Sequence, residues 1–164
     1  MKRQFYLLAL VMTVFSACKP SPQTAADYND CLMSEQKKVV VKYDELLETY
    51  DTYIPKKMDD ALLNFEIQVD NSIAAITETE AILEGEKLKA AVLEYLEVYR
   101  SIAEEEAQEL VRLYKVPENE FSPEMRVAWD SKYKAVDTKL KAADKKLQEV
   151  QKEFAENFNL QLSK

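Results

Sequence analysis

A single glycine, Gly85, is present in the 164 residues of this chain, and this shortage limits the possible folds more than any other feature. Glycine supplies the backbone geometry that tight β-hairpins and phosphate-binding loops need. The chain is rich in Ala, Leu, Glu and Lys, which are strong helix formers. We therefore expect an all-α protein without hairpins and without a glycine-rich phosphate loop.

Apolar residues recur at steps of three and four in four segments, and each segment is predicted to be a helix. The first runs over about 27–53 and the second begins near Pro55, with Gly85 as its stop signal. The third covers about 86–114, and the fourth begins after Ser122. The stripes predicted to face the core are Tyr28, Leu32, Val39, Tyr43, Leu46, Tyr50 and Tyr53; Met58, Leu62, Phe65, Val69, Ile73, Ile76 and Leu83, widened by Leu63, Ile67 and Ala74; and Leu88, Val92, Tyr95, Tyr99, Ile102, Leu110, Leu113 and Tyr114.

The fourth segment has the clearest start, because Ser122-Pro123-Glu124 combines a capping hydroxyl, a proline at the first turn and an acid near the positive end of the helix dipole. Its seam alternates steps of three and four, as in a coiled coil. A helix of some forty residues would span roughly 60 Å, against about 40 Å for the second and third helices. We expect its last turns to overhang or fray. The seam residues are Tyr133, Val136, Leu140, Ala143, Leu147, Val150 and Phe154.

Short connections near Pro55, Gly85 and Pro117 favour neighbouring helices that run antiparallel. The simplest architecture is an up-down four-helix bundle with a long C-terminal helix. An extended helical hairpin that dimerises is the alternative.

The amino terminus has the three parts of a secretory signal. Lys2 and Arg3 supply positive charge, residues 5–15 carry no charge, and the small residues Ser16 and Ala17 follow. As a helix the apolar run would cover roughly 16 Å, which is too short for a hydrocarbon core of about 30 Å. We therefore expect residues 1–17 to be a removable signal rather than a membrane span.

The sequence Phe15-Ser16-Ala17-Cys18 resembles the lipobox of bacterial lipoproteins, although this family prefers Leu where Phe15 stands. The resemblance implies cleavage before Cys18 and acylation of that residue, and two or more acyl chains give durable anchoring. The prolines and small polar residues that follow predict a flexible tether over 18–26. The domain organisation expected is thus a signal peptide (1–17), a tether (18–26) and a helical domain (27–164).

Charge narrows the possible partners. The full chain has a net charge of −8, and loss of the signal removes Lys2 and Arg3 but no acidic residue, which gives −10. Such a domain is repelled by nucleic-acid phosphates and by anionic lipid heads. We expect no nucleic-acid partner.

The sequence suggests no catalytic, metal or cofactor site. Without histidine, the usual nucleophile–histidine sites and the Glu-x-x-His di-iron site cannot form. If Cys18 is acylated, Cys31 has no partner, and we expect it to be a small buried side chain, with an intermolecular disulfide as the alternative. The acidic groups Glu94 and Glu97, Glu104 to Glu106, and Glu118 and Glu120 are interpreted as solvated faces, and a Ca²⁺ or Mg²⁺ cluster is the alternative.

Tyrosine is unusually frequent, and most tyrosines fall on or beside the seams. We expect boundary packing, with each ring inward and each hydroxyl outward; a cleft for a flat ligand is the alternative. Trp129 is expected to plug the core. Leu160 and Leu162 belong either to a frayed terminus or to a partner-binding end.

The layout of lipobox, polar tether and acidic helical domain resembles small helical surface lipoproteins of unknown function from Gram-negative bacteria. The resemblance implies a location in the cell envelope, in an outer membrane facing the periplasm or the cell surface. We expect a non-enzymatic binding module, anchored through acyl chains on Cys18, that engages a protein partner or a second copy of itself. The alternatives are a small-molecule or cation carrier with a Tyr- and Glu-lined interior, and a periplasmic holdase-like chaperone.

Overall fold

A computed structural model describes residues 19–161, and within this range every regular element is helical. The all-α prediction is therefore confirmed. A π-helical segment joins the third and fourth α-helices without a break, so that they form one rod. The elements are α1 (Pro22–Tyr50), α2 (Pro55–Glu78), α3 (Glu86–Ser101), η1 (Ile102–Ala107, the π segment), α4 (Gln108–Tyr114), η2 (Glu118–Glu120, a 3-10 turn) and α5 (Pro123–Phe158).

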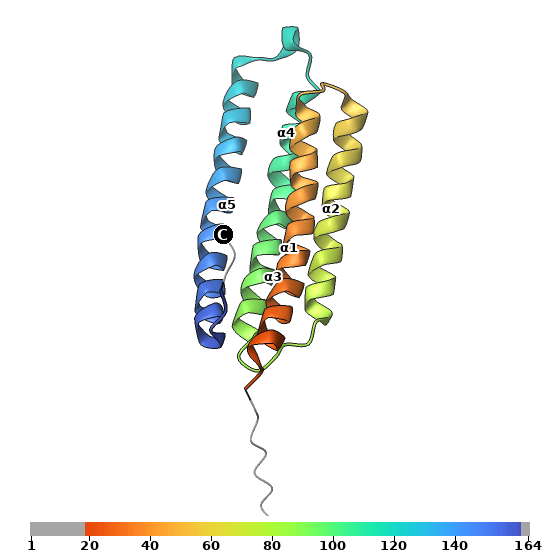
Figure 1. The fold of residues 1–164 in the computed structure, drawn as a ribbon. Helices are drawn as coiled ribbons and strands as arrows, with labels where there is room; N and C mark the ends of the chain where they lie inside the picture. Colours follow the sequence, from red (N-terminus) through yellow and green to blue (C-terminus); the bar gives the residue numbers. More distant parts are fainter. Residues whose placement is uncertain (1–18, 162–164) are drawn as a thin grey trace, which may run out of the picture.

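The helices lie side by side in an elongated helical bundle (Figure 1). α1 packs against α2 and α3, and α5 packs against α3 and α4. The α1–α2 and α4–α5 connections lie at one end, and the α2–α3 connection lies at the other (Figure 1). A continuous core, to which Leu32, Leu46, Phe65, Leu96 and Ile102 contribute, runs between the helices. No helix within residues 19–161 is long and apolar enough to cross a membrane.

α1 begins at Pro22, so the flexible tether predicted for residues 18–26 is wrong over its second half. Ser21 caps the helix by accepting a hydrogen bond from the backbone N–H of Thr24 at 3.1 Å. Ser21-Pro22 thus starts a helix in the same way as Ser122-Pro123. Ala25 is fully buried, which fixes this first turn against the core.

The first helix also ends earlier than predicted. α1 stops at Tyr50, and Tyr53 is not a core residue, because it lies in the connection to α2 with 73% of its surface exposed. The backbone of Tyr53 adopts a φ of 52°, the left-handed region that non-glycine residues rarely occupy.

α2 ends at Glu78 and not at Gly85, so the predicted stop signal is wrong. The ammonium group of Lys89 donates to the carbonyl oxygens of Thr77 at 2.9 Å and Thr79 at 2.6 Å, and thus satisfies carbonyls at the end of the helix. Gly85 instead precedes α3, where a Cβ would lie 2.9 Å from a ring carbon of Tyr28. The absence of a side chain at Gly85 therefore lets the Tyr28 ring pack closely against the backbone.

The prediction that the outer residues of the second stripe face the core is also wrong. Leu63 and Ile67 are about half exposed, Ala74 is exposed, and Leu83 lies beyond the helix with half of its surface in solvent. The apolar stripe of α2 is therefore narrower than predicted. Its buried members are Met58, Phe65, Val69 and Ile76.

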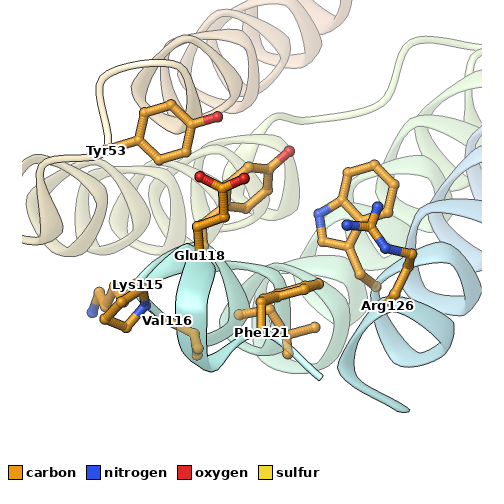
Figure 2. Close-up of a pocket in the computed structure, with 10 residues that line it drawn as sticks. Tyr53, Lys115, Val116, Glu118, Phe121 and Arg126 are labelled. Atoms are coloured by element: carbon orange, nitrogen blue, oxygen red, sulfur yellow. The ribbon is translucent and has the colours of Figure 1, made fainter. Parts of the chain in front are cut away.

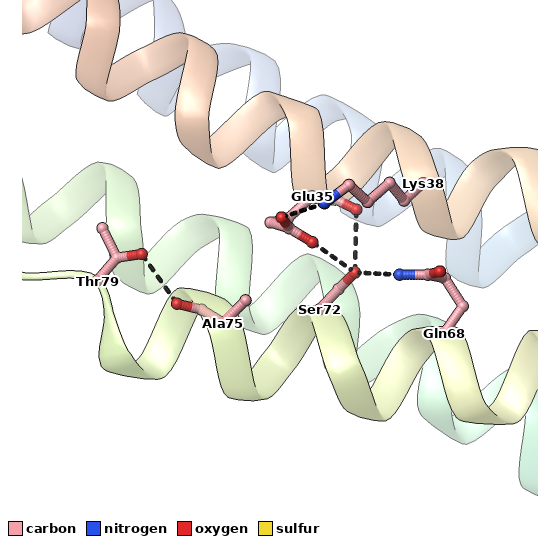
Figure 3. A network of polar contacts seen from close by, with 6 residues as sticks. All are labelled: Glu35, Lys38, Gln68, Ser72, Ala75 and Thr79. Atoms are coloured by element: carbon pink, nitrogen blue, oxygen red, sulfur yellow. Dashed lines mark hydrogen bonds and ion pairs between the residues drawn. The ribbon is translucent and has the colours of Figure 1, made fainter.

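A polar contact helps to fix α2 on α1 (Figure 3). Ser72 is fully buried, and its hydroxyl lies 3.1 Å from a carboxylate oxygen of Glu35 in α1. Gln68 donates to the same hydroxyl at 3.0 Å, and Lys38 pairs with Glu35 from the solvent side. The buried hydroxyl is thereby satisfied, as a polar group inside a core must be.

The long α5 helix neither overhangs nor frays within the described residues, contrary to the prediction. Phe154 and Phe158 in its last turns are buried, and Phe154 packs against Tyr28 with ring centroids 6.1 Å apart. Lys19 lies over the Phe158 ring at 4.9 Å and donates to a nearby backbone carbonyl. Asn159, with a φ of 55°, then ends the helix. The last turns are held because the start of the described chain packs against them.

Candidate functional site: an aromatic pocket at one end of the helices

A pocket of about 940 Å³ opens at the end of the bundle where α1 meets α2 and α4 meets α5. Its lining includes the aromatic rings of Tyr53, Tyr114, Phe121 and Trp129 and the charged side chains of Lys115, Glu118 and Arg126. We call it the end pocket. Figure 2 shows Tyr53 and Glu118 on one side of it and Arg126 on the other.

Local sequence signals build the frame of the end pocket. Pro117 follows the last turn of α4, and a proline there prevents continuation of the helix. Ser122 caps α5 by accepting a hydrogen bond from the N–H of Met125 at 3.3 Å. The segment between the two helices carries Phe121, which is thereby placed at the mouth. The turn that carries Tyr53 ends at Pro55, the first residue of α2.

The inner wall is held in place by aromatic packing. Tyr114 stacks on Tyr50 with ring centroids 4.2 Å apart and planes 12° from parallel. Trp129 packs against Tyr133 at 4.4 Å and meets the edge of Tyr114 at 6.2 Å. The Tyr114 and Tyr133 hydroxyls are 2.8 Å apart and share a hydrogen bond. The pocket-facing rings of Tyr114 and Trp129 are thus supported from behind by Tyr50 and Tyr133.

The charged groups of the end pocket differ in their partners. Lys115 forms an ion pair with Asp59 of α2, which neutralises it. Arg126 lies over the Phe121 ring at 5.7 Å, and no acidic side chain of residues 19–161 lies within ion-pair distance of it. Glu118 likewise forms no ion pair within this part of the chain. Among residues 19–161, the end pocket therefore has one cation, Arg126, and one carboxylate, Glu118, without an ion-pair partner.

The tyrosine hydroxyls behind the pocket stay protonated at physiological pH. Burial, followed by the nearby Tyr43 and Tyr114 hydroxyls, raises the pKa of Tyr50. Burial, and then the hydrogen bond with Tyr114, also raises the pKa of Tyr133. These groups remain neutral hydrogen-bond donors and add no negative charge.

A second polar cluster lies further along the helices. Gln36 of α1 donates to the Tyr95 hydroxyl at 3.2 Å, and that hydroxyl donates to Asp144 of α5 at 3.0 Å. The Tyr99 hydroxyl lies 3.3 Å from that of Tyr95. The prediction that hydroxyls point outward is wrong here, since these hydroxyls bond to one another and to side chains from other helices.

The π segment η1 carries the buried acid Glu106, which is 4% exposed. Lys139 of α5 contacts the Glu106 carboxylate at 2.7 Å and the Ser101 hydroxyl at 2.8 Å, with Glu105 at 3.3 Å. Burial alone would lower the pKa of Lys139, but the hydrogen bond and charge of Glu106, aided by Glu105, outweigh burial and raise it. Glu106 and Lys139 therefore form an ion pair that links the π segment to α5.

The residues that the sequence singled out do not gather into one site. Cys18 and the signal peptide lie outside the described residues, as does Leu162. Cys31 is exposed, so its prediction as a buried residue is wrong. It occupies a solvent-facing position on α1, next to the buried Leu32.

Several residues of the predicted acidic groups form ion pairs, whereas Glu118 has no such partner within residues 19–161. Glu94 pairs with Lys146, Glu97 pairs with Arg100, and Glu106 pairs with Lys139. Within residues 19–161, no group of three or more potential ligands is placed to hold a metal ion. Glu106 differs from the predicted solvated face because it is buried.

Comparisons with known proteins assign this chain to no family. No protein-family model, no curated protein and no solved structure matches it.

The apolar stripes of the helices do not predict several of the pocket residues. The first stripe places Tyr53 in the core, whereas Phe121 and Arg126 belong to no stripe and have no predicted role. Aromatic residues in the connections between helices are the sequence signal that points to such a pocket, because their rings do not belong to the apolar stripe of a helix. Trp129 is half-buried and packs on the core while one part of it lines the pocket.

Proposed function

We propose that this protein is a non-enzymatic binding module of the bacterial cell envelope, anchored by acyl chains on Cys18, and that the end pocket is its binding site. The observation that carries the proposal is a pocket with aromatic walls at the end of the helices. Its volume of about 940 Å³ suits a small ligand or an anchoring side chain. Aromatic residues and arginine are also the groups that dominate binding energy at recognition sites.

The position of the end pocket fits a tethered receptor. We propose that the helices form an antiparallel up-down bundle, with the anchor at one end and the pocket at the other. α1 begins beside the α2–α3 connection and ends beside the pocket (Figure 1). A helix of its 29 residues is about 44 Å long, so a lipid anchor at Cys18 would hold the pocket well away from the bilayer.

The chemistry of the described side chains favours binding over catalysis. The chain has no histidine, which is the most frequent general acid–base group. The interior tyrosine hydroxyls of Tyr95, Tyr99 and Tyr133 bond to neighbouring side chains. This supports a binding site at the end of the helices over a carrier that uses the bundle interior.

Membrane attachment is tested by Cys18→Ser in the native host. We expect the variant to leave the membrane fraction and to lose the mass of the acyl chains. A Cys18→Ser protein that remains membrane-bound with unchanged mass would contradict the anchoring proposal.

Binding at the end pocket is tested by photo-crosslinking in intact cells. A photoreactive amino acid replaces Tyr53, which is 73% exposed at the pocket, or Leu63, which is 55% exposed on α2 and serves as the matched control. We expect a discrete adduct from position 53 that is absent from position 63. Adducts that are equal at both positions, or absent at position 53, would refute the proposal.

A further inference from the structure

We propose that the end pocket binds a small aromatic monocarboxylate, with its ring held against Trp129 and Tyr114 and the carboxylate on the guanidinium group of Arg126. This inference rests on the proposed binding function and names the ligand class of the same pocket. Three observations support it: the arginines differ in whether they have an acidic partner, the pocket has aromatic walls, and Glu118 lines the same pocket.

Arg126 stands apart from the other arginines of the described chain. Arg100 contacts both carboxylate oxygens of Glu97 and also Asp70, and Arg112 contacts both oxygens of Glu109. Arg126 has no such partner among residues 19–161, although acidic residues outnumber basic ones by 30 to 22 in the chain. Its planar fork of donors matches a carboxylate in two parallel hydrogen bonds. With no acidic partner in the described part of the chain, the guanidinium group can bind a carboxylate that a ligand supplies.

The walls of the pocket suit a flat apolar group beside that carboxylate. Tyr114 and Trp129 are held by the packing of Tyr50 and Tyr133 behind them, so a ligand does not have to order them. Tyr53 extends over the opposite side of the pocket on a turn with left-handed backbone geometry (Figure 2). Aromatic pairs gain from offset or edge-to-face contact beyond the burial of area.

The remaining charges limit the ligand to a single negative charge. Glu118 is exposed, lines the same pocket and has no cationic partner among the described residues. It repels a second negative charge, and Lys115 cannot compensate because Asp59 already pairs with it. A phosphate or a dicarboxylate is thus disfavoured, whereas a monocarboxylate can reach Arg126.

The test uses the purified full-length chain, in which Trp129 is the sole tryptophan and reports directly on the pocket. Phenylacetate, phenethylamine, phenylalanine and benzyl alcohol share one ring and differ in charge. None of them absorbs at the red edge of tryptophan absorption, so Trp129 emission can be titrated with each. We expect phenylacetate to bind about twofold to fivefold tighter than benzyl alcohol and phenethylamine, because one exposed charge-assisted contact contributes that much.

Matched variants assign the effect to named side chains. Arg126→Gln should weaken phenylacetate binding about twofold to fivefold and leave benzyl alcohol binding unchanged. Glu118→Gln should strengthen phenylacetate binding about twofold to threefold, since a repelling charge is removed. Lys134→Gln removes an exposed positive charge from the same helix about 12 Å further on and should change neither.

The outcomes separate this inference from the proposed function. Equal binding of all four compounds, tighter binding of phenethylamine, or an Arg126→Gln variant with unaltered phenylacetate affinity would overturn the monocarboxylate proposal. A complete lack of response to the four compounds would also overturn it. In each case the crosslinking experiment at position 53 still decides independently whether the end pocket is a binding site.

Discussion

Replacement of Lys139 by Met should destabilise the protein far more than loss of an ordinary surface lysine. Lys139 is the cation that faces the buried carboxylate of Glu106, at 2.7 Å. The Glu106 side chain is 5% exposed and the Lys139 side chain is 31% exposed. Lys139→Met keeps much of the aliphatic stem and removes the charge, so Glu106 is left as a buried anion without its cation.

The size of the effect follows from these exposures. Removal of one partner from a fully buried pair costs about 3–5 kcal/mol, because the remaining charge stays desolvated. Lys139 is partly open to water, which lets solvent reach the Glu106 carboxylate after the substitution, so we expect a loss of about 2–3 kcal/mol in the free energy of unfolding. Replacement of both residues, as Lys139→Met with Glu106→Leu, should recover most of this loss, since no unpaired charge remains.

The assay is urea unfolding followed by far-ultraviolet circular dichroism at neutral pH. Lys146→Met is the matched control, because Lys146 lies on the same helix and pairs with Glu94 while both side chains are 57% exposed. Exposed pairs contribute about 0–1 kcal/mol, so this control should stay close to the unmodified protein. A Lys139→Met variant that loses no more stability than Lys146→Met would refute the reasoning, and so would a double variant that is less stable than Lys139→Met.

Three further predictions concern buried residues. The Tyr50 hydroxyl is buried, and no group within residues 19–161 bonds to it. Tyr50→Phe should therefore raise the free energy of unfolding by about 1 kcal/mol, whereas Tyr95→Phe should lower it by about 1–2 kcal/mol. A loss of stability on Tyr50→Phe would show that the hydroxyl has a partner in solution. Gly85→Ala should lower stability by about 1–3 kcal/mol, measured as a fall in Tm, because the added Cβ would meet neighbouring side-chain atoms at 2.8 and 2.9 Å. Burial raises the pKa of Tyr43 from 10.0 to about 12. The stability that the protonated Tyr43 hydroxyl contributes is therefore complete below pH 10 and is lost as the pH rises through 12. In a spectrophotometric titration, the Tyr43 phenolate should form only as the pH approaches 12 or when the protein unfolds.

The helices themselves could be predicted from the sequence because their signals are local. The start of α5 at Ser122-Pro123 and the end of α4 before Pro117 depend on side chains within one turn of the boundary. The same signal is present at Ser21-Pro22, but two prolines among small polar residues predict a tether there instead. The prediction that Gly85 ends the second helix is wrong for a different reason. The contact that requires a glycine comes from Tyr28, which is far away in the sequence.

Only the tertiary structure decided the candidate site. The end pocket combines Tyr53 from one connection with Phe121 and Arg126 from another, and neither connection contains information about the other. The partners of the polar interior have the same origin, because Lys139 reaches Glu106 only when α5 packs on the π segment in one particular register. The sequence by itself determined the helical composition and the starts of α2, α3 and α5, since backbone propensity and capping act within a few residues. The pocket and the buried pairs depend on how separate helices are aligned, and that alignment is set by the packing of the whole core.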